Sequence, residues 1–79
     1  MTKALNKFIV LLQAFKTAID AREKYEKAAV KLETQPQNEV ALLDANEAMF
    51  EYDMACQNAM VELDTYIDKK VDEILHPND

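Results

Sequence analysis

The sequence predicts an all-α fold, a two-helix antiparallel hairpin that forms a single domain over residues 1–79. The chain contains no glycine, and the tight turns of a β-protein usually need glycine at positive φ. Apolar residues recur at alternating steps of three and four on both sides of one internal break. That break is Pro36, which does not fit inside a helix. We therefore expect a helix over residues 3–33, a turn over 34–38 and a second helix over 39–75.

The helix expected over residues 3–33 carries a continuous stripe along one side. Its members, spaced alternately four and three apart, are Ala4, Phe8, Leu11, Phe15, Ala18, Arg22, Tyr25, Ala29 and Leu32. Arg22 is the one charged member. It either forms a buried pair with Glu51 or Asp53 that fixes the register of the helices, or packs its stem and extends its guanidinium into water.

The turn expected over residues 34–38 has residues suited to ending one helix and starting another. Pro36 disfavours helical geometry at Gln35, the residue before it. Asn38 is a good N-cap for the second helix, and Glu39 interacts favourably with the positive end of that helix's dipole. The chain is therefore expected to fold back on itself at this point.

The helix expected over residues 39–75 repeats the same spacing. Its stripe contains Leu42, Ala45, Met49, Tyr52, Cys56, Ala59, Leu63 and Tyr66, and Ile67, Val71 and Ile74 continue it. Two helices side by side cannot cover apolar faces this broad. We therefore expect the hairpin to self-associate, most simply as two hairpins in an antiparallel four-helix bundle, or as a tetramer. The residues expected to form the core or the oligomer contacts are Phe8, Leu11, Phe15, Tyr25, Leu42, Met49, Tyr52, Leu63 and Ile67.

Charge separates the two halves of the chain. Residues 1–34 carry a balance of +3 and residues 35–79 a balance of −9. Folding back at Pro36 would bring Arg22 near Glu51 and Lys7 near Asp64 or Asp68, and such edge charges set orientation and partner choice. The acidic second helix is expected to contact a basic surface on another protein. The candidate contact residues are Glu47, Glu51, Asp53, Asp64, Asp68 and Asp72.

Composition argues against several other classes of protein. A net charge of −6 disfavours non-specific binding to nucleic acid, and the lack of glycine argues against a phosphate-binding loop. The longest apolar run, residues 8–12, is far too short to span a membrane. Lys3 and Lys7 before that run resemble a signal peptide only faintly, because Gln13 and Lys16 interrupt it early. We therefore expect a cytoplasmic protein without a membrane segment.

Nothing in the sequence points to catalysis, a cofactor or a metal. A catalytic thiol at Cys56 would need a base, and His76 lies 20 residues further along the same expected helix, about 30 Å by helical rise. Glu73 and His76 have the Glu-x-x-His spacing of di-iron bundles. They lie at a helix end next to Pro77, and a histidine placed there for its favourable interaction with the helix dipole is the preferred interpretation.

Two smaller clusters each have a structural and a functional interpretation. Met49, Met54 and Met60 are preferred as ordinary core, with an adaptable partner groove as the alternative. Lys24, Lys27 and Lys31 line one helix face and could contact the phosphates of RNA in a hairpin dimer. Because neighbouring glutamates dilute that positive charge, a solvated face is the preferred interpretation.

Parts of the chain resemble two known families. Lys31-Leu32, Pro36-Gln37-Asn38, Leu42 and Glu51-Tyr52 resemble the turn and second helix of type III secretion needle subunits, although Glu39 stands where those have a second proline. This resemblance implies a structural subunit of a filament. Residues 18–53, with Tyr25 before the turn, resemble the first hairpin of the small YlbF/YheA-like helical proteins. No site residue is carried over from either family.

Together these observations predict a non-enzymatic protein–protein interaction module. It would be a small adaptor, inhibitor or accessory factor of the kind common in bacterial and phage systems, acting through its acidic second helix. The alternatives are a structural subunit resembling the needle proteins and an RNA-binding hairpin dimer.

Overall fold

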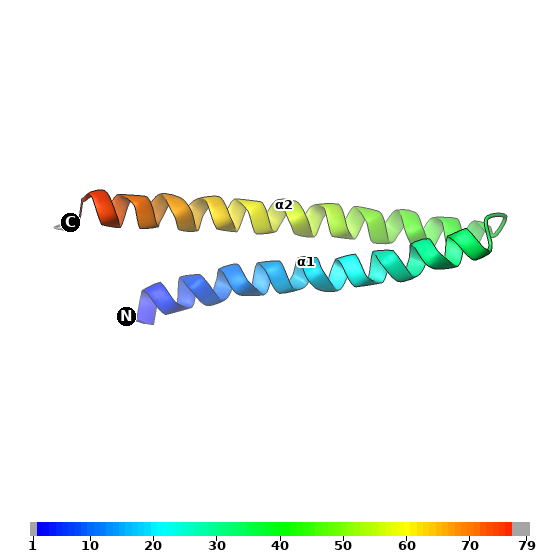
Figure 1. The fold of residues 1–79 in the computed structure, drawn as a ribbon, viewed down its shortest axis with the longest axis horizontal. Coiled ribbons are helices and arrows are strands. Elements are labelled where there is room, and N and C mark those ends of the chain that lie inside the picture. Colours follow the sequence, from blue (N-terminus) through cyan, green and yellow to red (C-terminus); the bar gives the residue numbers. More distant parts are fainter. Residues whose placement is uncertain (1, 77–79) are drawn as a thin grey trace.

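The protein is a helical hairpin, as the sequence predicted (Figure 1). The computed structural model describes the backbone of residues 2–76 and the side chains of residues 5–76. Helix α1 spans Thr2–Thr34 and helix α2 spans Glu39–Leu75. The two run antiparallel, so that the start of α1 and the end of α2 lie at the same end of the molecule. The hairpin measures 62 × 18 × 13 Å along its principal axes, and its length follows from the rise of ~1.5 Å per helical residue.

The turn between the helices is held by Gln35 and Asn38. The Gln35 amide donates to the carbonyl oxygens of Lys31 and Leu32, which terminates α1. Asn38 is the N-cap of α2, and its side-chain oxygen accepts from the amides of Val40 and Ala41 at 2.9 and 3.2 Å. These bonds satisfy amides that have no partner inside the helix. The predicted cap is therefore confirmed, and the turn needs no residue with positive φ among those described.

The contact between the helices is built mainly from alanine. The described residues that are buried are Leu11, Ala14, Ala18, Ala41, Ala45, Ala48 and Ala59, and none of them is polar. We call these seven residues the alanine seam. Because a methyl side chain is short, two helix backbones can approach each other closely along such a line. The same property means that the seam buries little apolar surface.

The seam coincides with the predicted stripe only in part. Leu11, Ala18, Ala45 and Ala59 belong to both, whereas Ala14, Ala41 and Ala48 each lie one position before a stripe residue. On α2, Ala41 and Ala48 are each 1% exposed, whereas the adjacent stripe residues Leu42 and Met49 are 47% and 50% exposed. Both lines have heptad spacing, and they are separated by one residue, or about 100° around the helix. The helix pair buries the line of alanines because their short side chains permit the closer approach of the two backbones. The bulky line is left on the neighbouring face.

The expected core therefore needs correction. Of the nine residues named for the core or oligomer contacts, Leu11 is buried and Tyr25, Tyr52 and Leu63 are half-buried. The other five are exposed in the single hairpin and do not form its core. They are Phe8, Phe15, Leu42, Met49 and Ile67. Their role in an oligomer stays a prediction.

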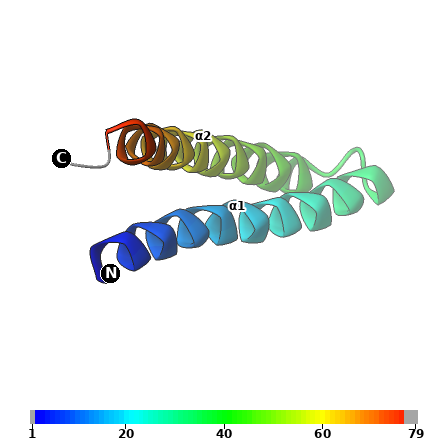
Figure 2. The ribbon, with the colours of Figure 1, turned by 60° about the vertical axis from the view of Figure 1, so that its left-hand side comes forward.

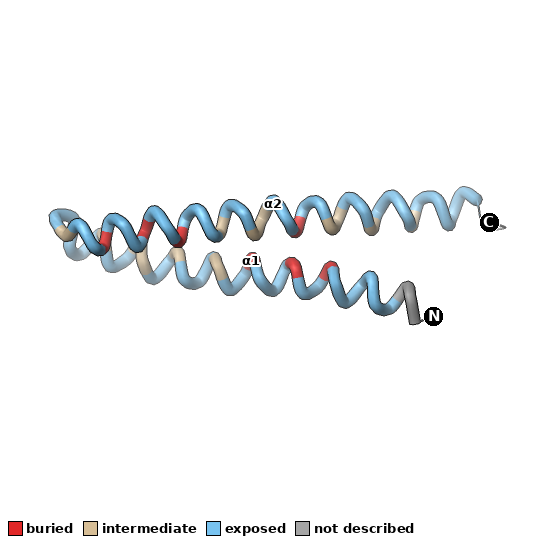
Figure 3. The backbone as a smooth tube through the Cα atoms, turned by 180° about the vertical axis from the view of Figure 1, so that it is seen from behind, coloured by how far each residue is buried: buried red, intermediate tan, exposed pale blue. Residues whose placement is uncertain are grey.

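The two helices diverge toward the end that carries the termini (Figures 1 and 2). Within the described side chains, burial is confined to the part between Leu11 in α1 and Ala59 in α2 (Figure 3). Nearer the open end, large rings replace alanine, and Phe8 contacts Tyr66 with ring centroids 5.9 Å apart. A second aromatic pair, Tyr25 and Tyr52, stacks at 6.1 Å closer to the turn. Each such pair contributes ~0.5–1.5 kcal/mol beyond its buried area and helps to fix the register.

The seam yields a prediction for an overpacking variant. Replacing Ala48 with leucine should destabilise the protein by ~1–3 kcal/mol, because the added carbons force the helices apart. Asn58→Leu adds a side chain of the same kind on an exposed position of α2 and should change stability by less than ~0.5 kcal/mol. Urea denaturation followed by circular dichroism measures both. Equal effects of the two substitutions would contradict close packing at Ala48.

Candidate functional site: an apolar face and an acidic line

One broad side of the hairpin is apolar and carries two grooves. The first is lined by Phe15, Ile19 and Arg22 from α1 and by Cys56 and Met60 from α2, above the seam residues Ala18 and Ala59. Both helices therefore direct bulky apolar side chains to the same side of the pair. The sequence placed these residues on stripes but did not show that the two stripes share one face.

The second groove continues this surface toward the turn. It is lined by Tyr25, Asn46, Met49, Phe50, Tyr52, Asp53 and Cys56. Cys56 lines both grooves, so the two join at the middle of α2. Helical spacing carries the same side of each helix along the hairpin. We define the apolar face as Phe8, Leu12, Phe15 and Ile19 of α1 with Met49, Cys56, Met60, Leu63 and Ile67 of α2.

The methionines lie on the surface of the single hairpin. Met49, Met54 and Met60 are 50%, 49% and 53% exposed, so they do not form the core of the single hairpin, and their burial in an oligomer stays a prediction. Met49 and Met60 line the two grooves. The reason is the alanine seam, which fills the space between the helices and leaves the flexible thioether side chains outside. Such side chains adapt readily to a partner surface.

The opposite broad side of the hairpin is polar. It carries a groove lined by Asn6, Lys7, Val10, Glu62, Thr65, Tyr66 and Lys69. Lys24 of α1 reaches across to α2, and its Nζ donates to Glu51 Oε2 at 2.9 Å. This hydrogen bond and the charge of Glu51 raise the pKa of Lys24, with smaller contributions from Glu47 and Asp44.

The expected pairing of Arg22 with Glu51 is wrong. Arg22 Nε lies 3.7 Å from Glu26 Oε1 on its own helix, and its side chain is about half exposed. Arg22 also lines the first groove. Its stem therefore lies along apolar surface while its guanidinium reaches water, which is the second of the two arrangements that the sequence allowed. Lys24, two residues further on, points to the side where Glu51 lies and forms the ion pair that was expected of Arg22.

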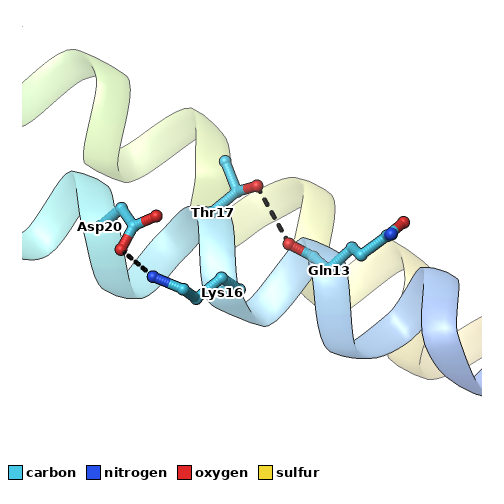
Figure 4. A network of polar contacts seen from close by, with 4 residues as sticks. All are labelled: Gln13, Lys16, Thr17 and Asp20. Carbon is cyan, nitrogen blue, oxygen red and sulfur yellow. Dashed lines mark hydrogen bonds and ion pairs between the residues drawn. The ribbon is translucent and has the colours of Figure 1, made fainter.

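The outer side of α1 satisfies its polar groups locally (Figure 4). Lys16 Nζ donates to Asp20 Oδ1 at 2.6 Å, and Thr17 Oγ1 donates to the carbonyl oxygen of Gln13 at 3.0 Å. The bond to Asp20 raises the pKa of Lys16. These are contacts one helical turn apart that support α1 weakly, and they bring no group from α2 into a site.

The six candidate acidic residues do not form one patch. Glu51 contacts Lys24, and Glu47 lies close enough to influence the pKa of that lysine. Asp53 accepts a hydrogen bond from Gln57 at 3.1 Å and lines the second groove. The remaining three, Asp64, Asp68 and Asp72, are exposed and follow one another at steps of four in the last part of α2. We call these three the acidic line.

The end of α2 shows no metal centre in the described residues. No group of three or more histidine, cysteine, aspartate or glutamate side chains is arranged to hold a metal ion there or elsewhere in the described part. Glu73 pairs with Lys70 at 3.4 Å, and His76 Nε2 lies 4.0 Å from Asp72 Oδ1. Cys56 is half-buried and forms no disulfide. Neither described helix has an apolar stretch long enough to cross a membrane.

The chain matches no protein-family model, no curated protein and no solved structure. The surfaces of the hairpin that are suited to binding are the apolar face and the acidic line.

The Lys24–Glu51 contact yields a prediction with a pH dependence. Because the folded state raises the pKa of Lys24, the contact stabilises fully below the ordinary lysine pKa and is lost as the pH rises through the raised value. Lys24→Gln should therefore lower the denaturation midpoint at neutral pH, and the difference from the unmodified protein should vanish in strong alkali.

Lys27→Gln provides the matched control, since Lys27 is an exposed lysine on the same helix. It should change the midpoint less than Lys24→Gln at neutral pH and low salt. Salt should also reduce the effect of Lys24→Gln, because exposed charge pairs are screened. An effect of Lys24→Gln that is independent of both pH and salt would contradict the electrostatic origin of the contact.

Proposed function

We propose that the protein is a non-enzymatic interaction module that self-associates and binds a second protein with a basic surface. The acidic line is the observation that supports binding to a basic surface. It consists of three exposed carboxylates, each one helical turn from the next, on the more acidic half of the chain. Residues 35–79 hold eleven acidic residues against two lysines. The +3 balance of residues 1–34 offsets only part of that charge. An excess of negative charge on one helix steers association with basic partners.

The absence of assembled catalytic groups among the described residues supports a role in binding. The single cysteine and the single histidine are 20 residues apart along α2, about 30 Å by helical rise. An adaptor, an inhibitor or an accessory factor needs only a surface of this kind. The proposal includes a cytoplasmic site of action, which the unpaired thiol of Cys56 fits because reducing compartments keep thiols free.

Neutralising the acidic line tests the proposed partner surface. The variant Asp64→Asn, Asp68→Asn, Asp72→Asn should bind the partner about tenfold more weakly or worse, because three charges facing a basic surface are lost. The partner is identified by capture from an extract of the native host with mass spectrometry. The affinity of the purified partner is then measured by titration calorimetry at two salt concentrations.

The control for this test removes three negative charges from α1 with Glu23→Gln, Glu26→Gln and Glu33→Gln. Both variants change the net charge from −6 to −3, so a difference between them reports position rather than total charge. The control should bind as the unmodified protein does. Equal weakening by both variants, or by neither, would contradict the assignment of binding to the acidic line.

A second candidate function is a structural subunit of a filament. The observation that favours it is a second apolar line on α2, which comprises Leu43, Phe50, Met54 and Val61, each about half exposed or more. Their spacing of seven, four and seven places them on one side of α2, apart from the seam. A subunit with apolar surface on two sides can contact neighbours in two directions, which open helical assemblies require.

Light scattering over a wide concentration range separates the two candidates. A closed assembly of an interaction module should reach a constant mass of two or four chains, because its symmetric interfaces are then all occupied. A filament subunit should increase in mass continuously with concentration, and Val61→Glu, on the second apolar line, should abolish that increase. A strict monomer at high concentration would contradict self-association in either form.

A further inference from the structure

The apolar face of the hairpin has the dimensions of an interface with a second copy of this chain. The broad side of the whole hairpin measures 62 Å by 18 Å, so a second hairpin laid along it covers the entire apolar face and has room for the ~800 Å² that each partner buries in a standard stable interface. A second hairpin has the same length and covers this side from end to end. A single short peptide helix would leave much of it in water.

The weakness of the isolated hairpin argues for the same occupant. Its buried residues are six alanines and one leucine, with no large side chain fully buried among the described residues. A chain of this size needs a larger core, a staple or association to be stable. A cover that is present wherever the chain is present would supply the missing buried surface. A second copy always meets that condition.

Two symmetric arrangements bring the apolar faces together with their long axes aligned. In the first, the two turns lie at the same end, and α1 of each copy packs against α2 of the other. In the second, the turns lie at opposite ends, α1 packs against α1 and α2 packs against α2. Both give an antiparallel four-helix bundle, so packing of apolar side chains alone does not choose between them.

The charge asymmetry of the chain chooses between these arrangements. Residues 1–34 carry +3 and residues 35–79 carry −9. With the turns at opposite ends, the two acidic helices are neighbours across the interface and repel each other. With the turns at the same end, every contact between copies joins the more basic helix to the acidic one. Opposite charge at the edges of packed helices selects orientation in this way.

We infer that two copies pack through their apolar faces with both turns at the same end of a four-helix bundle. The inference rests on the self-association in the proposed function and adds the interface and the orientation. Each copy contributes both of its helices to the shared core, in which Phe15, Met60 and Ile67 are buried. The acidic line remains available on the outside for a further partner.

The distance between the two turns tests the orientation directly. A spin label is attached through Gln37→Cys in a Cys56→Ser background, since Gln37 is exposed in the turn. Pulsed electron paramagnetic resonance should give a distance of about 20–30 Å between labels, since the turns lie on helices packed ~10 Å apart. The arrangement with turns at opposite ends would give a distance near the 62 Å length of the hairpin and would overturn the inference.

Cys56 supplies an independent readout without any substitution. It lies beside residue 57, the middle of α2, and on the apolar face. With the turns at opposite ends and the faces fully overlapping, the two Cys56 thiols would meet near the symmetry axis and oxidise to a disulfide. With the turns at the same end they lie on diagonally opposite helices, beyond the ~7 Å between Cα atoms that a disulfide allows. Mild oxidation should therefore give no covalent dimer.

Paired substitutions test which face is used. Phe15→Glu places a charge on the apolar face and should weaken the dimer by about 30-fold or more in sedimentation equilibrium. Val61→Glu places the same charge on the outer side of α2, at a residue that is 61% exposed and lines neither groove, and it should leave the dimer intact. Met60→Glu repeats the first test from the other helix, in case Phe15→Glu prevents folding.

The remaining outcomes separate this inference from the proposed function. A dimer with labels near 62 Å apart overturns the arrangement and leaves self-association standing. A dimer dissociated by Val61→Glu and not by Phe15→Glu overturns the choice of face and also leaves self-association standing. A strict monomer overturns both. Continuous growth with concentration overturns the closed dimer and supports the filament.

Discussion

The close approach of two helices along a line of alanines determines the rest of this structure. Ala41, Ala45 and Ala48 of α2 lie near the turn, opposite the last part of α1. Ala14 and Ala18 of α1 lie further from the turn, where Ala18 and Ala59 of α2 line the same groove. The small residues hold the helices together from the turn to the level of Leu11 and Ala59, but their methyl groups bury little surface. The bulky apolar side chains are consequently displaced to one broad side. The exposed apolar face is thus a direct consequence of how the hairpin closes.

Charged side chains then determine the orientation of helix contacts, which apolar packing alone does not specify. Lys24 and Glu51 join the two helices on the polar side of the hairpin, while the excess acid of α2 stays exposed at Asp64, Asp68 and Asp72. Individually, such surface charges contribute little to stability. Collectively, they distinguish one helix from the other, and that distinction underlies both the basic partner we propose and the orientation of the dimer we infer.

The bounds of the helices could be predicted because they depend on local chemistry. Pro36 and Asn38 act on the backbone within a few residues, and α2 spans the predicted range of residues 39–75. The rotation of each helix could not be predicted with the same rule, since the bulky line and the alanine line have the same period. A signal was nevertheless present. Alanine recurs every seven residues at positions 14, 21 and 28 and again at 41, 48 and 55, which indicates a close-packed seam.

The sequence by itself determined the two helices, the place of the turn, the N-cap at Asn38 and the separation of charge between the halves. Each of these depends on a residue's own backbone preferences or on its charge. Only the tertiary structure decided which line of each helix is buried, that Glu51 meets Lys24 rather than Arg22, and that the apolar lines of both helices share one face. These depend on the rotation of one helix against the other. That rotation is set by how closely the backbones can approach, and alanine allows the closest approach.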